Sequence, residues 1–99
     1  MSHRGSLLCL PSGIFAWPLT NAEAIDERSL ALVFAQSAEI GLFLLGTGQE
    51  PWQVPDTLRA RFHGSGISLE VMRTGQAANT YNILLGEGRR VGAGLIAVD

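Results

Sequence analysis

The chain contains no lysine, and all seven of its basic residues are arginines. A Schiff base and a nucleotide-binding P-loop both need a lysine amine, so these two kinds of chemistry are excluded. The arginines are scattered, and only Arg89 and Arg90 are contiguous. The net charge is −2, and no basic stripe of the kind that binds nucleic acid is present, so we expect no nucleic-acid partner.

Cysteine and histidine are almost as scarce. The single Cys9 cannot form an internal disulfide, and two histidines are too few for a Cys/His cluster with metal-ligand spacing. Cys9 also has no neighbouring base in the sequence that would stabilise a thiolate nucleophile. The sequence therefore predicts no catalytic residue, no metal and no cofactor, and it favours a reducing compartment.

Long apolar runs are missing as well. The run at residues 7–10 is stopped by Pro11 and is shorter than the roughly 7 to 15 apolar residues of a signal-peptide core. The run at residues 42–45 is far below the roughly 20 residues that span a bilayer. We expect a soluble, cytoplasmic protein with no direct membrane insertion.

What the chain has is an apolar composition in a short length. Its 99 residues suffice for one domain with one modest core. The charged fraction of 16% is below the roughly 25% of an average soluble domain, and 46% of the residues are hydrophobic. A sheet buried on both faces would explain this composition, and so would an interface with a partner.

The first half of the chain predicts two strands and a helix. Two short apolar runs, at residues 6–10 and 14–17, surround a Pro-Ser-Gly turn and indicate a hairpin or a kinked edge. Leu30 and Val33 then recur at helical spacing, which predicts a helix over residues 26–36. Residues 40–45 are nearly continuous apolar sequence, as expected of a central strand.

The second half predicts two units of strand, helix and strand. Pro55 suits the first turn of a helix in which Leu58 and Phe62 share one face. The alternation at residues 67–72 predicts a strand nearer the sheet edge, after which Thr74 is a good helix N-cap. The apolar face of that helix consists of Ala77, Ala78, Tyr81, Leu84 and Leu85. Gly86 or Gly88 can end the helix.

Residues 91–98 predict the last strand, whose small residues would let a helix pack closely. The predicted class is α/β, a single three-layer domain over residues 1–99 around a mixed, largely parallel sheet. The element order is strand, strand, helix, strand, helix, strand, helix, strand.

Three runs carry a family resemblance: RGSLLCLPSGIFAW at 4–17, LFLLGTG at 42–48 and GISLEVMRTGQAANTYNILLGEGRRVGAGLIAV at 66–98. Together they resemble a small Mth-type domain family of largely unknown function, whose eukaryotic members include a mitochondrial complex I assembly factor and an adipogenesis-associated protein. The resemblance implies a three-layer α/β fold around a mixed five-stranded sheet. Members of the family are not established enzymes, so the resemblance implies no reaction. Arg73 and Asn79 stand where many bacterial members have Asp and Arg, and family members usually carry a strand-forming segment upstream, so we expect N-terminal strands to be lacking here.

Two segments are candidates for a ligand site, because parallel strands gather loops and helix N-termini at their carboxyl ends. Gly46, Thr47 and Gly48 follow one predicted strand, and Arg73 and Thr74 follow the next. Their hydroxyls, amides and guanidinium could hold a small anion. Alternatively the glycines form a tight turn and Thr74 caps its helix, which we favour because a lone Gly-Thr-Gly is no nucleotide fingerprint.

Four further residues are candidates for contacts. Asn82 lies beside apolar helix positions and should bond to a loop backbone or, alternatively, to a ligand. Trp52, in a polar loop, is expected to be an exposed aromatic of the kind enriched at interfaces. Arg89 and Arg90 follow the last helix and form either a docking patch or an ordinary solvated turn.

With the resemblance, these features predict a non-enzymatic module for protein interaction or assembly, with another protein as its partner. Two alternatives stay open. The first is binding, or turnover, of a small anion at the carboxyl strand ends. The second is self-association through an exposed edge strand, which would give a homo-oligomer.

Overall fold

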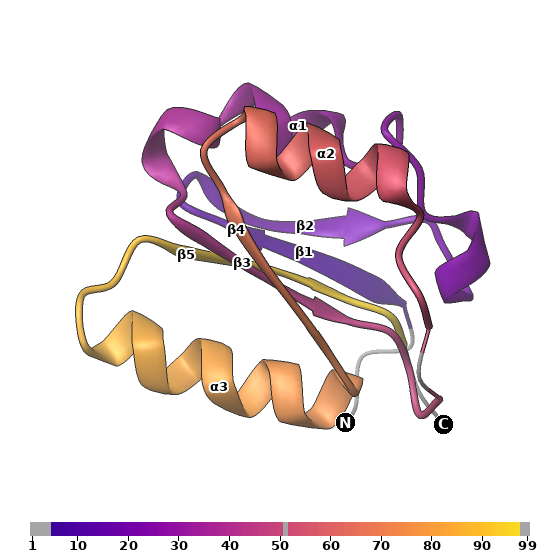
Figure 1. The fold of residues 1–99 in the computed structure, drawn as a ribbon. Coiled ribbons are helices and arrows are strands. Elements are labelled where there is room, and N and C mark those ends of the chain that lie inside the picture. Colours follow the sequence, from indigo (N-terminus) through magenta and orange to yellow (C-terminus); the bar gives the residue numbers. More distant parts are fainter. Residues whose placement is uncertain (1–4, 51, 98–99) are drawn as a thin grey trace.

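The computed structural model describes residues 5–50 and 52–97, which fold around a single sheet (Figure 1). The strands are β1 (Ser6–Leu10), β2 (Gly13–Trp17), β3 (Leu42–Gly46), β4 (Ser68–Met72) and β5 (Val91–Leu95). The helices are α1 (Ala31–Ala35), α2 (Asp56–Gly64) and α3 (Thr74–Gly86), with short 3-10 helices η1 (Ala22–Ala24) and η2 (Ser37–Glu39).

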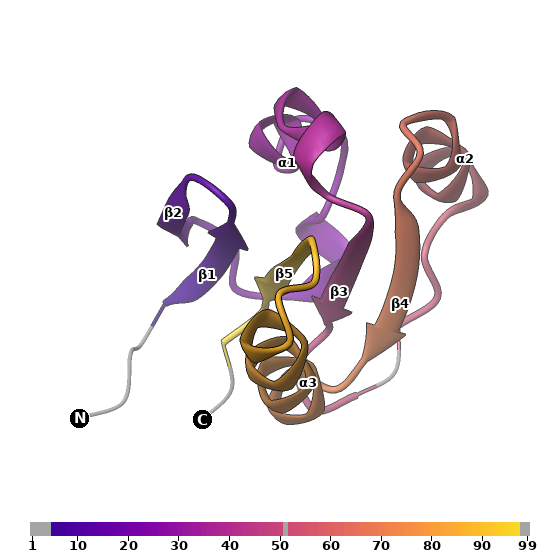
Figure 2. The same cartoon turned by 90° about the vertical axis from the view of Figure 1, so that its left-hand side faces the viewer.

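The strands are arranged in the order β2-β1-β5-β3-β4. β3 pairs in parallel with β4 and β5, while β1 pairs antiparallel with β2 and β5. The units β3-α2-β4 and β4-α3-β5 place their helices on opposite faces of the sheet (Figure 2). The predicted three-layer α/β class is confirmed, as are the N-terminal hairpin, the interior position of β3 and the edge position of β4.

The two faces of the sheet are packed differently. We call the face covered by α1 and α2 the aromatic face, because its core contains Trp17, Phe43 and Phe62, none of them more than 3% exposed. The rings of Phe43 and Phe62 stack with their centroids 5.4 Å apart. The opposite face, covered by α3, we call the α3 face. Its buried residues are Cys9, Leu44, Ala77, Tyr81, Val91 and Ala93.

α1 is shorter than the helix predicted over residues 26–36, since it spans only Ala31–Ala35. Asp26 and Ser29 bond to each other first: the Asp26 carboxylate accepts from the Ser29 amide at 2.8 Å, and the Ser29 hydroxyl accepts from the Asp26 amide at 2.9 Å. The Ser29 carbonyl, which a longer helix would use, accepts instead from the Trp17 indole N–H at 2.8 Å. Residues 26–30 still form backbone turns, with the Leu30 amide donating to the Asp26 carbonyl at 3.2 Å, but the side-chain bonds and the Trp17 contact hold these turns outside the regular helix.

The small residues of β5 serve mainly the aromatic face and not helix packing as predicted. A Cβ on Gly94 would lie 2.9 Å from the Trp17 ring, and one on Gly92 would lie 3.3 Å from the Phe43 ring. Only Ala93, which is fully buried, points to the α3 face. β5 also ends at Leu95, three residues before the predicted end, and Val98 lies outside the described residues.

Candidate functional site

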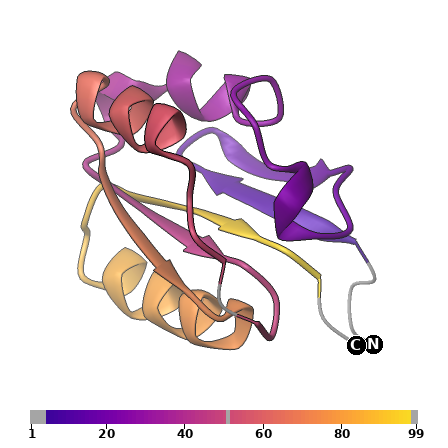
Figure 3. The same cartoon turned by 45° about the vertical axis from the view of Figure 1, so that its right-hand side comes forward.

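The two segments predicted as a ligand site, residues 46–48 and 73–74, lie in contact in the structure. The Thr47 amide donates to the Met72 carbonyl at 3.0 Å, and the Thr74 amide donates to the Gly48 carbonyl at 3.0 Å. Because β3 and β4 are parallel neighbours, the turn after β3 and the start of α3 lie at the same edge of the sheet (Figure 3). The structure therefore brings together the turn at residues 46–48, Arg73 and Thr74.

Thr74 does not cap its own helix, which corrects the predicted N-cap. α3 begins at Thr74 with Arg73 before it, and no side chain caps its first turn. The Thr74 hydroxyl accepts from the Gly48 amide at 2.8 Å and donates to the Ile96 carbonyl at 2.7 Å. This buried hydroxyl therefore joins the β3 turn and the end of β5 to the start of α3. We call these two bonds the Thr74 bridge.

The glycines of the turn have structural reasons to be glycine. A Cβ on Gly46 would lie 2.7 Å from the Thr74 Cα, a distance that real Cβ atoms do not reach, so any side chain would push α3 away from β3. Gly48 has a φ of +89°, which L side chains rarely adopt. The Gly-Thr-Gly run therefore makes a tight turn that lets α3 approach the sheet closely.

Backbone groups also engage Thr47. Its hydroxyl oxygen lies 3.1 Å from the Glu50 carbonyl and 3.4 Å from the Met72 carbonyl. The Arg73 side chain is exposed and borders a hollow of about 720 Å³ at the N-terminus of α3. The hollow is lined by Gly48, Gln49, Arg73, Gly75 and Gln76.

Asn82 is not part of this group. It lies on the exposed surface of α3, eight positions after Thr74 and thus about 12 Å further along the helix axis. Its apolar neighbour Tyr81 is buried, as expected, but Asn82 itself faces solvent, so water can satisfy its amide and the argument that it needs a partner does not hold. Arg89 and Arg90 lie still further away, where β3 and β5 begin, and the Arg90 guanidinium donates to the Ala38 carbonyl at 3.3 Å.

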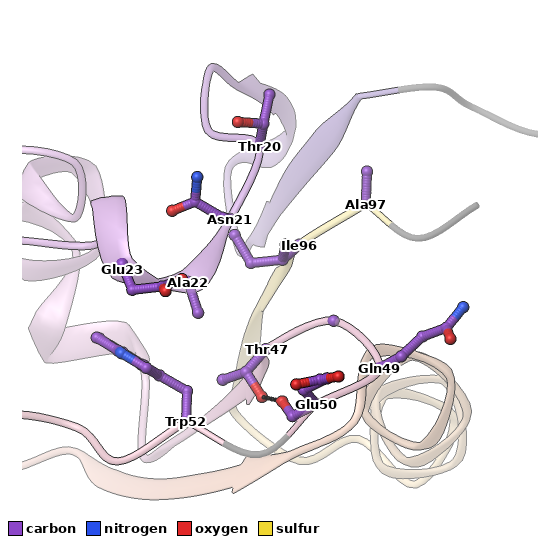
Figure 4. A pocket seen from close by; sticks show the side chains of 11 residues that line it. Thr20, Asn21, Ala22, Glu23, Thr47, Gln49, Glu50, Trp52, Ile96 and Ala97 are labelled. Atoms are coloured by element: carbon purple, nitrogen blue, oxygen red, sulfur yellow. Dashed lines mark hydrogen bonds between the residues drawn. The ribbon is translucent and has the colours of Figure 1, made fainter.

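Trp52 is half-buried and packs against the core of the aromatic face, which corrects its prediction as an exposed aromatic. It lies between two hollows at the carboxyl edge of the sheet. One, of about 670 Å³, includes Arg73 and Glu70 in its lining. The other, of about 490 Å³, lies toward η1 and the end of β5 (Figure 4), and we call it the Trp52 hollow.

The Trp52 hollow is lined by Thr20, Asn21, Ala22, Glu23, Thr47, Gly48, Gln49, Glu50, Trp52, Ile96 and Ala97. Its two charged residues, Glu23 and Glu50, come from segments far apart in the sequence, η1 and the turn after β3. Sequence reasoning missed both. Glu50 could have been found, because it follows the predicted turn closely, but nothing local indicates that η1 packs beside that turn.

Cys9 is buried in the α3 face, and burial raises the pKa of its thiol above the ordinary value of 9.0. Burial also raises the pKa of Tyr81, and the nearby Cys9 raises it further. The thiol is therefore protonated at neutral pH, a form that reacts poorly as a nucleophile.

Residues 5–50 and 52–97 contain no group of three or more His, Cys, Asp or Glu placed to hold a metal ion. In the same ranges, every helix is too short or too polar to cross a bilayer.

Comparison with known proteins finds relatives that match nearly the whole chain. A profile of a family described as "Protein of unknown function (DUF498/DUF598)" matches residues 1–96. An uncharacterized protein of Rhodobacter capsulatus is 36% identical over 94 residues, which cover 95% of this chain and 70% of that protein. Bovine NADH dehydrogenase [ubiquinone] 1 alpha subcomplex assembly factor 3 is 34% identical over 93% of this chain. The chain spans 50% of the length of that assembly factor.

A solved structure shows the same fold. The crystal structure of an outer membrane protein from Bartonella henselae superimposes with a TM-score of 0.93 at 40% sequence identity. The match covers 100% of this chain and 83% of the other.

Proposed function

The chain belongs to the DUF498/DUF598 family of proteins of unknown function, and on that premise we propose that it is a non-enzymatic module that binds another protein and assists the assembly of a larger complex. The observation that carries this proposal is the 34% identity to a protein named as a complex I assembly factor, over 93% of the chain. An assembly module needs a docking surface and no reaction. We also propose the cytoplasm as its compartment, supported by a single cysteine that cannot form an internal disulfide.

The surface around Trp52 is the best-supported docking surface. Tryptophan is enriched among the few residues that dominate binding energies at interfaces. Trp52 is held on one side by the aromatic-face core and borders hollows on the other, so binding would cost little side-chain ordering. Arg89 and Arg90, at the opposite end of the sheet, and the β2 edge, where Ile14 is 66% exposed, are the competing surfaces.

Affinity capture from extract of the native cell, with mass spectrometry of the captured proteins, tests this function. We expect the Trp52→Ala variant to lose a partner that the unmodified protein recovers, because truncating an interface anchor typically costs about 2 kcal/mol or more, roughly 30-fold in affinity. Matched variants are Arg89→Ala and Ile14→Ala, each at one competing surface. Retention of every partner by all three variants would contradict the proposal, and the size of the purified protein shows whether the partner is a second copy.

A second candidate function is the binding of a small anion beside Arg73. The observation that favours it is the exposed guanidinium next to the N-terminus of α3 and a hollow of about 720 Å³. The Thr47 and Thr74 hydroxyls are engaged with backbone groups, so Arg73 and the helix amides would supply the contacts.

Thermal unfolding with and without inorganic phosphate tests this candidate. A ligand at 100 times its dissociation constant stabilises the folded state by about 2.7 kcal/mol. We expect phosphate to raise the melting temperature of the unmodified protein and not that of the Arg73→Ala variant. An equal shift in an Arg59→Ala control and in Arg73→Ala would assign the effect to nonspecific salt stabilisation and end the candidate.

A further inference from the structure

The Trp52 hollow is lined by carboxylates, whereas the hollow of about 720 Å³ at the N-terminus of α3 has Arg73 as its charged lining residue. Glu23 and Glu50 are the two charged lining residues of the Trp52 hollow, and no arginine of the described chain lines it. Its volume of about 490 Å³ falls within the roughly 300 to 1,000 Å³ of ligand-binding clefts. The two carboxylates repel a negatively charged ligand, so the hollow favours a neutral or cationic occupant.

Glu23 and Glu50 have no cationic partner among residues 5–50 and 52–97. In the ranges that the structure describes, one salt bridge is formed, between Arg61 and Glu27 at 3.7 Å, and neither lining glutamate takes part in it. Both glutamates are exposed at the rim (Figure 4). An incoming cation would therefore meet carboxylates that form no ion pair with another described residue.

Trp52 adds an aromatic surface to the same hollow. A guanidinium or ammonium group placed over an indole face is attracted by the ring quadrupole, and arginine can also stack on the ring. The core of the aromatic face holds the ring in place, because Trp52 packs against it. Arginine suits a planar ring with carboxylates at the rim better than lysine does, because a guanidinium both stacks on the ring and bonds to carboxylates through two N–H groups.

We propose that the Trp52 hollow receives an arginine side chain of the partner protein, with Trp52 as the stacking surface and Glu23 and Glu50 as the counter-charges. This inference rests on the proposed function and specifies the chemistry of the partner at one point of contact. It predicts that the docking segment of the partner is basic, and that salt weakens the complex.

The test is an NMR titration of the ¹⁵N-labelled protein with the peptide acetyl-Gly-Arg-Gly-amide and, as a matched control, the same peptide with neutral citrulline in place of arginine. The Trp52 indole N–H reports on the hollow. The Trp17 indole N–H is an internal reference, because it is buried and bonded to the Ser29 carbonyl. We expect a saturable Trp52 shift with the arginine peptide at roughly millimolar concentration, at least threefold tighter than with citrulline.

The double variant Glu23→Gln, Glu50→Gln should remove the difference between the two peptides, while Glu87→Gln, an exposed glutamate after α3, should keep it. Equal binding of both peptides, or no saturable Trp52 shift, would overturn the inference. The peptide experiment needs no partner, whereas capture with Trp52→Ala tests the proposed function, so the two can fail separately.

Discussion

The two faces of the sheet solve the same packing problem in different ways. On the aromatic face, large rings fill the space and the strand beneath them is reduced to glycine at positions 92 and 94. On the α3 face the buried side chains are mostly small, and α3 approaches so closely that Gly46 cannot carry a Cβ. The first face depends on apolar volume. The second depends on backbone proximity and on the Thr74 bridge.

This difference bears on where function can reside. The α3 face fixes the loops at the carboxyl edge, because the Thr74 bridge joins the turn after β3, the start of α3 and the end of β5. The core of the aromatic face packs against the Trp52 side chain. The Trp52 hollow lies where these two supports meet, so a docking surface there would be rigid before a partner arrives.

The largest expected loss of stability comes from a substitution in the core of the aromatic face. Phe43 is fully buried and stacks on Phe62, so Phe43→Ala should lower the free energy of unfolding by about 3 to 5 kcal/mol through lost burial and a cavity. Leu44→Ala on the α3 face, at the neighbouring position of β3, is the matched variant, at about 2 to 4 kcal/mol. Urea unfolding measures both. A larger loss for Leu44→Ala would reverse our ranking of the two faces.

Replacing a glycine by alanine on each face compares how well the two faces tolerate an added methyl group. Gly46→Ala places a Cβ 2.7 Å from the Thr74 backbone, whereas Gly94→Ala places one 2.9 Å from the Trp17 ring. Overpacking costs about 1 to 3 kcal/mol, and we expect Gly46→Ala at the upper end because a helix must move. Thermal unfolding of the two variants measures the difference. If Gly94→Ala is the more damaging, then the rings and not the helix are the rigid element.

Much of the architecture could be predicted from local patterns. Alternation and apolar runs located all five strands, and Leu58 with Phe62 located the buried face of α2. The failures have tertiary causes. The start of α1 depends on the Trp17 indole bonding to Ser29, and the role of Thr74 depends on Ile96 being adjacent in space. Neither neighbour can be read from the segment itself.

The candidate site was predictable only in part. The meeting of Gly48 and Thr74 followed from parallel strands, because their carboxyl ends share an edge. That Glu23 and Glu50 line the same hollow could not be predicted, since η1 is a single 3-10 turn whose location is set by the chain on either side. A surface built from irregular segments leaves no periodic signal in the sequence.

The next prediction breaks the Thr74 bridge alone. Thr74→Val keeps the shape of the side chain but leaves the Gly48 amide and the Ile96 carbonyl without their partner, which should cost about 1 to 3 kcal/mol. Thr74→Ser keeps the hydroxyl and should retain most of the stability. Urea midpoints compare the two variants. A larger loss in Thr74→Ser than in Thr74→Val would mean that the methyl group, and not the bridge, stabilises the α3 face.

The smallest expected effect is a dependence of stability on pH that arises on the α3 face. Among the described residues, burial raises the pKa of Cys9 and of Tyr81, and both groups lie on the α3 face. As the pH rises above 9.0, the ordinary pKa of the thiol, the unfolded chain loses its proton before the folded one, so stability should fall. The slope is at most about 1.4 kcal/mol per pH unit for each proton. Cys9→Ala should reduce that slope in urea unfolding between pH 8 and 10, and an unchanged slope would assign it to Tyr81 and other groups.

The Thr74 bridge also has a consequence for the lifetime of the folded protein. It joins residues 26 positions apart on one side and 22 on the other, so we expect it to form late in folding, after β3 and β5 have paired. Contacts between distant segments that complete late are absent from the folding transition state, and their loss accelerates unfolding while leaving folding unchanged. The Thr74 hydroxyl should therefore set how long a folded molecule persists, and with it how long a docking surface is presented to a partner.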